Sequence, residues 1–198
     1  MDIIKLNAID STNSYLLNLS RAVHLEDPTI VITNNQTKGR GQHGTSWQSV
    51  PQQSLLFSVF KRFEDLPSNK IPNITYAVSL GLENAFKKYK IPNITIKWPN
   101  DIMSRSKKMA GILIENQWKG SLLEVAIVGI GINVNQVNFD DLQGVTSLSL
   151  LGSKNYDLKE VLTKVFEKIE FYYNLLKRGD INQINHIYFN HLMYHTDY

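Results

Sequence analysis

The sequence predicts an α+β domain in which a mixed, mostly antiparallel sheet packs against helices. Short β-branched or apolar runs indicate strands, and two long stretches with apolar residues at helical spacing indicate amphipathic helices. Two consecutive apolar runs between residues 108 and 134 are separated only by a turn, which indicates an antiparallel hairpin. Strands, helices and paired strands are mixed along the chain, as in α+β domains.

The first 60 residues predict three strands and one short helix. Ile3–Ile9, the β-branched run Thr29–Thr33 and Ser54–Phe60 are predicted strands. Asp10–Asn13 offers residues preferred at helix N-caps, and Ser14–Leu19 behind it is predicted to be a short helix. The polar S-T-N triplet at residues 11–13 therefore lies at a strand-to-helix junction, where N–H groups and hydroxyls point outward together.

The remaining elements follow from apolar spacing and from the residues that interrupt it. Pro92 prevents one helix from continuing, and Gly179 takes the usual place of glycine after a helix. The predicted elements are helices at Asn73–Tyr89, from Leu158 to near Gly179 and at Ile181–Met193, and strands at Thr95–Trp98, Ile102–Ser104, Lys108–Asn116 and Leu122–Val134.

The composition is that of an ordinary globular chain, and it excludes several functions. With 198 residues, 42% of them hydrophobic, the chain is long enough for one domain with a core. The net charge of +3 is too small to indicate nucleic-acid binding. The longest apolar run, Val125–Val134, is too short to span a bilayer, and there is no cysteine for disulfides or thiol chemistry. We expect a cytoplasmic protein with neither DNA nor membrane as a partner.

The stretch Lys38–Trp47, K-G-R-G-Q-H-G-T-S-W, predicts a loop that holds a small anionic ligand. Its glycines allow a backbone to approach a ligand closely, and successive N–H groups in such a loop can bind an anion. Arg40 adds donors suited to carboxylate or phosphate, and Trp47 offers a flat face for stacking. A flexible turn without a ligand is the alternative interpretation of this loop alone.

Five signatures in order along the chain resemble the biotin protein ligase family. They are S-T-N at 11–13, Q-T-K-G-R-G-Q-H-G-T-S-W at 36–47, K-W-P-N-D-I at 97–102, K-M-A-G-I-L-I-E at 108–115 and G-I-G-I-N-V-N at 129–135. The resemblance implies a biotin/lipoate ligase catalytic domain, similar to class II aminoacyl-tRNA synthetases, that extends over residues 1–198. It also implies an activity: biotin and ATP form biotinyl-5′-AMP, and biotin is then transferred to one lysine of a biotin carboxyl carrier protein or domain.

The resemblance also implies the roles of individual residues. Lys108 and Arg40 would supply positive charge to the reacting carboxylate and phosphate, as a site that joins two anions requires. Asp101 would help to hold Mg²⁺. The residues implied to bind biotin are Ser11, Thr12, Asn13, Gln36, Gly39, Arg40, Gly41, Gln42, Lys108 and Gly111. The residues implied to bind ATP are Arg40, Trp47, Asn100, Asp101 and Asn133.

The chain departs from the family pattern in its loop and at both ends. Gln42 and Thr45 stand where the family often has arginines, which predicts a weaker hold on the adenylate. We expect Gln42→Arg to slow adenylate release; unchanged or faster release would contradict this. The chain starts at the catalytic core without a winged-helix domain, so we expect no transcriptional repression. It stops soon after the last helix, where relatives carry a small β-barrel, which leaves a truncation open.

Two alternative functions remain open, and four aromatic side chains need separate interpretation. A lipoate or octanoate ligase or transferase would need an apolar tunnel in place of the polar triplet, and a non-catalytic biotin- or nucleotide-binding module would not need Lys108. We expect Trp98 in the core and His43 in a solvated loop. His191 and His195, four residues apart near the chain end, are expected at the surface or in packing, not at a metal. Whether the protein forms a homodimer stays open.

Overall fold

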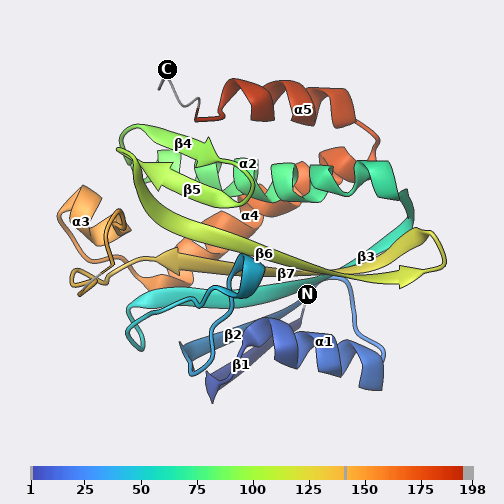
Figure 1. The fold of residues 1–198 in the computed structure, drawn as a ribbon, viewed down its shortest axis with the longest axis horizontal. Coiled ribbons are helices and arrows are strands. Elements are labelled where there is room, and N and C mark those ends of the chain that lie inside the picture. Colours follow the sequence, from blue (N-terminus) through green and yellow to red (C-terminus); the bar gives the residue numbers. More distant parts are fainter. Residues whose placement is uncertain (1, 141, 194–198) are drawn as a thin grey trace.

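The computed structural model contains one seven-stranded sheet with helices on both faces (Figure 1). It describes residues 2–140 and 142–193. The strand order is β1-β2-β3-β7-β6-β5-β4, in which β1 and β2 are parallel and all other neighbours are antiparallel. The strands are β1 (Asp2–Ile9), β2 (Thr29–Gln36), β3 (Ser54–Pro67), β4 (Ile94–Lys97), β5 (Asp101–Ser104), β6 (Lys107–Lys119) and β7 (Leu122–Asn133). The predicted mixed, mostly antiparallel sheet is confirmed.

The helices divide unequally between the two faces of the sheet, each over its own apolar core (Figure 1). On one face, α2 (Pro72–Lys88), α4 (Leu158–Lys177) and α5 (Ile181–Asn190) cover the main core. On the other face, α1 (Thr12–Ala22) packs Leu16 into a small core at the β2–β3 end. No α-helix of the described residues lies on the same face over β6 and β5 (Figure 1).

The predicted element boundaries are close to those observed, with errors at the ends. The first helix begins two residues earlier than expected, because Ser11 is its N-cap and accepts a hydrogen bond from the Ser14 N–H. The third strand continues to Pro67, across a register shift. The sequence analysis missed the short helix α3 (Leu148–Gly152) and the 3-10 turns Gln42–Gly44 and Ser68–Lys70, which are too short to show a hydrophobic period.

The chain after α5 covers the outer edge of the sheet. The backbone of Ile96 on β4 accepts a hydrogen bond from Met193 N–H and donates one to the His191 carbonyl. The His191 ring lies 2.6 Å from the buried carboxylate of Glu83 on α2, which fixes the position of this segment. His191 thus has a packing role, as expected, and its predicted neighbour His195 lies outside the described residues. No described cluster of three or more His, Cys, Asp or Glu could hold a metal ion.

A buried lysine joins the sheet to α4. The Lys61 ammonium on β3 is 3% exposed and pairs with Asp27 at 3.2 Å and Glu170 at 2.8 Å. Replacing Lys61 by methionine fills the same space but leaves both carboxylates without this cation. We expect the free energy of unfolding in urea to fall by about 3 kcal/mol, as for other broken buried pairs. Lys159→Met, at an exposed position of α4, is the control and should change it by less than about 0.5 kcal/mol.

Candidate functional site

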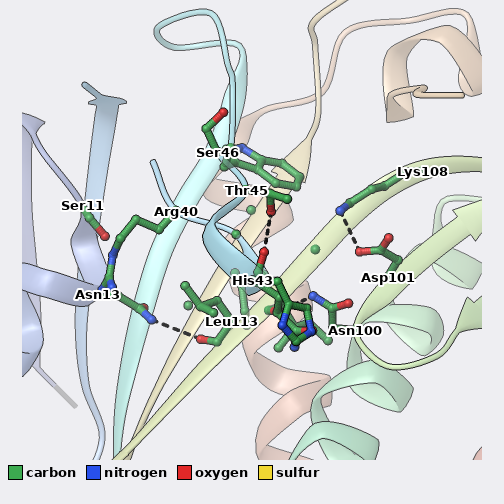
Figure 2. Close-up of a pocket in the computed structure, with 18 of the residues that line it drawn as sticks. Ser11, Asn13, Arg40, His43, Thr45, Ser46, Asn100, Asp101, Lys108 and Leu113 are labelled. Carbon is green, nitrogen blue, oxygen red and sulfur yellow. Dashed lines mark hydrogen bonds and ion pairs between the residues drawn. The ribbon is translucent and has the colours of Figure 1, made fainter. Parts of the chain in front are cut away.

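A cavity of about 410 Å³ opens on the uncovered part of the sheet. It lies between the glycine loop (residues 38–47), the first turn of α1, the turn between β4 and β5, and strands β6 and β7 (Figure 2). Its volume falls in the range of small-molecule sites. The predicted site residues that line it are Ser11, Thr12, Asn13, Gln36, Arg40, Gly41, Gln42, Trp47, Asn100, Asp101, Lys108 and Gly111.

One end of the cavity is built from neutral hydrogen-bonding groups. Thr12 donates its backbone N–H to Gln36 Oε1 at 2.8 Å, and its hydroxyl oxygen lies 3.1 Å from the same atom. Ser58, buried on β3, has its hydroxyl oxygen 2.7 Å from Thr12 Oγ1 and 2.6 Å from Asn13 Oδ1. The Ser11 hydroxyl and the Gln36 amide nitrogen have no acceptor within the described part of the chain, so they keep donors for a ligand.

The other end of the cavity carries a lysine held in place by its backbone. Lys108 donates its N–H to the Gly144 carbonyl at 2.7 Å, and its own carbonyl accepts from Thr146 N–H at 2.9 Å. Its ammonium lies 2.7 Å from Asp101 Oδ1 and 5.4 Å from the centre of the Trp47 ring (Figure 2). The side chains of Lys108 and Asp101 are 32% and 20% exposed, so an incoming anion can reach the cation.

The second cation of the cavity is paired as well. Arg40 Nη2 lies 2.6 Å from Glu115 Oε2 on β6, and Asn13 Nδ2 donates to the same oxygen at 2.9 Å. Figure 2 shows Arg40 next to Ser11 and Asn13, across the cavity from Lys108 and Asp101. Each of the two predicted cations therefore has its own carboxylate, and these carboxylates lie at opposite ends of the site.

Trp47 lies flat against the sheet because two glycines leave room for it. A Cβ at Gly131 would stand 2.6 Å from Trp47 Cε2, and one at Gly111 would stand 2.9 Å from Trp47 Cζ3. Both distances are too short for real contacts. Asp101, Gly111 and Gly131 are direct neighbours across β5, β6 and β7, so the ring rests on one row of the sheet beside Asp101. The group that approaches these two glycines closely is therefore the protein's own Trp47 side chain.

A second cavity of about 510 Å³ lies beyond Trp47. Thr45, Ser46, Trp47 and Lys108 line both cavities, so the indole and the lysine stand between them. The second cavity adds an apolar wall from the loop after β7 together with one polar side chain; these residues are Phe139, Leu142, Val145 and Asn133. Asn133 is buried and donates its amide to the Thr146 carbonyl at 3.1 Å.

The structure differs from the sequence prediction at Gly39 and Trp98 and adds two site residues. Gly39 does not line the cavity but packs against the Trp47 backbone, and Asn133 lines the second cavity. The prediction that Trp98 lies in the core is wrong: the side chain is 67% exposed at the cavity, because the chain turns away from the sheet at Pro99. Ser58 and Glu115 were missed, although each is a polar residue within an otherwise apolar strand run, which was the available signal.

The cavity thus has neutral hydrogen-bonding groups at one end and a reachable cation at the other. The chain belongs to the biotin/lipoate A/B protein ligase family, whose model matches residues 6–133. This confirms the resemblance drawn from the five signatures.

Individual relatives support the same family. The chain is 35% identical over 147 residues to the bifunctional ligase/repressor BirA of Bacillus subtilis (strain 168), covering 71% of this chain and 45% of the relative. It is 29% identical over 163 residues to the biotin–[acetyl-CoA-carboxylase] ligase of Mycobacterium tuberculosis, covering 81% and 59%. The chain thus spans about half the length of the curated relatives it matches.

A solved structure shows the same fold. The biotin protein ligase from Aquifex aeolicus in complex with biotin and ATP superposes with a TM-score of 0.83 at 30% identity, covering 98% of this chain and 79% of that one. The predicted biotin ligase-like fold class is therefore confirmed. None of the helices in residues 2–140 and 142–193 has the length and apolar character needed to cross a membrane.

Proposed function

We propose that residues 1–198 carry the catalytic domain of an ATP-dependent biotin protein ligase. The observation that supports it best is the chemistry at the two ends of the cavity. Neutral hydrogen-bonding side chains (the cradle: Ser11, Thr12, Asn13 and Gln36) line one end, and Lys108 lies at the other. Biotin has a ureido ring at one end and a carboxylate at the other. An apolar tunnel, which a lipoyl or octanoyl chain would need, is not what Ser11, Thr12, Asn13 and Gln36 provide.

The first half-reaction joins two anions, so positive charge is needed between them. A biotin carboxylate oxygen attacks the α-phosphorus of ATP, the bond from this phosphorus to the α,β-bridging oxygen breaks, and pyrophosphate leaves with that electron pair. Lys108 lies where this carboxylate would end, and it can follow the charge onto the phosphoryl oxygen. The carboxylate would displace Asp101 from Lys108, because both are anions that pair with the same ammonium.

The second half-reaction needs no further charged group from this chain. The uncharged amine of the carrier lysine attacks the acyl carbon, an amide bond forms, the bond to AMP breaks, and a proton leaves the amine. The name of the Mycobacterium tuberculosis relative supports a carboxylase carrier domain as the acceptor. We place this reaction in the cytoplasm, and we include no DNA-binding role in the proposal.

Trp47 and the second cavity suit the adenine of ATP. The indole is held against the sheet, and the opposite wall is formed by the apolar side chains Phe139, Leu142 and Val145. A flat ring between these surfaces would be desolvated on both sides. The Aquifex aeolicus structure contains both biotin and ATP, which supports a site for two ligands. Asn133 and Asn100 would contribute polar contacts on the same side.

Asp101 fits a magnesium ion that ATP brings with it. Magnesium is commonly held by one or two carboxylates together with phosphate oxygens and water. The Asp101 side chain is 20% exposed and lines the cavity, and its Oδ1 atom pairs with Lys108. When bound, the ion would neutralise phosphate charge. The carboxylate would become available to it once the biotin carboxylate replaces Asp101 on Lys108.

The deciding experiment measures pyrophosphate release from ATP with biotin or lipoate as the acid. We expect release with biotin and bound biotinyl-adenylate that gel filtration retains with the protein. Release with lipoate alone would favour the lipoate ligase alternative. Biotin binding without pyrophosphate would favour a binding module. Addition of a carboxylase carrier domain should then consume the adenylate and raise the mass of the carrier by one biotinyl group.

A further inference from the structure

Glu115 joins two parts of the site that are far apart in sequence. Its Oε2 atom lies 2.6 Å from Arg40 of the glycine loop and 2.9 Å from the Asn13 amide of α1. The side chain extends from β6 behind the lining of the cavity and is 26% exposed. A ligand in the cavity would therefore be arranged by Glu115 through Arg40 and Asn13 and not through direct contact.

Glu115 determines which way the Asn13 amide faces. A carboxylate only accepts hydrogen bonds, and so does the Leu113 carbonyl, 3.1 Å from Asn13 Nδ2. The NH₂ group must point to these two acceptors, which places Oδ1 toward Ser58, 2.6 Å away. Because Oδ1 cannot donate, the single hydroxyl proton of Ser58 goes to Asn13.

The orientation of the Asn13 amide determines which hydroxyl is the donor between Ser58 and Thr12. Ser58 has no second proton, so the Thr12 hydroxyl is the donor across their 2.7 Å contact. The remaining lone pairs of Thr12 Oγ1 then accept from a ligand N–H at the cradle end of the cavity. With the Asn13 amide reversed, Ser58 would donate to Thr12, which would occupy one lone pair of Thr12 Oγ1 and turn the Thr12 proton toward Gln36 Oε1, 3.1 Å away. Fewer lone pairs would then be left to accept from a ligand N–H.

The same carboxylate holds the glycine loop. The Arg40–Glu115 pair is the only ion pair that this loop makes with the sheet among the described residues. The loop has two internal hydrogen bonds, from Gly41 N–H to the Thr45 carbonyl and from Trp47 N–H to the Gly39 carbonyl. Its two ends are held by a hydrogen bond from Lys38 N–H to the Asp10 carbonyl and by the packing of Trp47 on the sheet. Loss of the ion pair should let the loop open more often.

We propose that Glu115 is a positioning residue with two effects. It fixes which groups donate and which accept among Asn13, Ser58 and Thr12, and it holds the glycine loop over the cavity through Arg40. This inference rests on the proposed function, because the ligand whose N–H groups meet Thr12 is taken to be biotin. Two substitutions separate the two effects. Glu115→Gln keeps an oxygen acceptor for Asn13 but loses the charge that holds Arg40, whereas Glu115→Ala loses both.

The experiment compares biotin binding by calorimetry with amide hydrogen exchange of residues 38–47. We expect the biotin Kd to rise about 3-fold in Glu115→Gln and about 30-fold in Glu115→Ala, as for the loss of a hydrogen bond to a charged group. The ATP KM should stay within about 2-fold in the same variants. Loop exchange should speed up in both, equally in Arg40→Ala, and no further in Arg40→Ala/Glu115→Ala. Glu124→Ala on the neighbouring strand β7 is the control and should change neither readout.

The outcomes distinguish the inference from the function it rests on. A wild-type protein that neither binds biotin nor releases pyrophosphate would remove the proposed function and this role with it. A wild-type protein that binds biotin, while Glu115→Ala binds it equally well, would remove the role of Glu115 alone. Equal losses of biotin and ATP affinity in Glu115→Ala would show a structural effect only and would also overturn the inference.

Discussion

Replacing Lys108 by alanine is expected to abolish adenylate formation while leaving the fold intact. The ammonium is the only side-chain cation that lines both cavities within the described residues, so no neighbour can replace it. Removing one such group that stabilises transition-state charge costs about 100- to 1,000-fold in rate. Single-turnover measurement of pyrophosphate release with saturating biotin and ATP would show this loss.

Two variants control for side effects of this change. The Lys108 side chain is 32% exposed and its backbone is held by Gly144 and Thr146, so thermal unfolding of Lys108→Ala should resemble that of the wild type. Lys107→Ala removes an exposed neighbouring cation and should keep full activity. Release by Lys108→Ala within about 5-fold of the wild type would contradict the central role given to this lysine.

Replacing Gly131 by alanine is expected to displace Trp47 and to weaken both halves of the site. The added Cβ would stand between 2.6 and 2.9 Å from three atoms of the indole, and the sheet behind it cannot yield. Overpacking of this kind costs about 1–3 kcal/mol, which corresponds to roughly 5- to 150-fold in affinity. Because the ring lies between the cavities, the KM values for biotin and ATP should both rise.

A double-mutant cycle separates displacement of the ring from other damage. In a Trp47→Ala background, Gly131→Ala meets no indole and should add little further loss. Fluorescence of Trp47, in a protein with Trp98 and Trp118 replaced by phenylalanine, should shift when Gly131 is changed. Additive losses in the cycle, with unchanged fluorescence, would show that the glycine does not act through Trp47.

Most of the fold could be predicted from the sequence because its signals are local. The apolar spacing of α2 and α4 and the β-branched or apolar runs of β2, β3, β6 and β7 are properties of neighbouring residues. Other features depend on contacts between residues that are far apart in the sequence, and these could not be predicted. Trp98 is a local exception: it was predicted in the core, but the turn at Pro99 directs the chain away from the sheet and leaves the side chain 67% exposed.

The residues that line the site could largely be predicted from the sequence, but the contacts between them could not. The motifs identified Ser11, Thr12, Gln36 and Lys108, and the structure brings them around one cavity. The sequence contained no indication that Arg40 would pair with Glu115, 75 residues away. The packing of Trp47 across Gly111 and Gly131 was equally hidden, because it depends on the register of three strands.

The sequence by itself determined the class of sheet, the positions of its helices, and the residue types that a carboxylate ligand and a polar ring need. These follow from periodicity, turn chemistry and side-chain donors and acceptors, which neighbouring residues set together. Only the tertiary structure decided that each cation meets its own carboxylate and that one tryptophan divides two cavities. Those contacts join residues far apart in the chain, and no local pattern records which strand faces which loop.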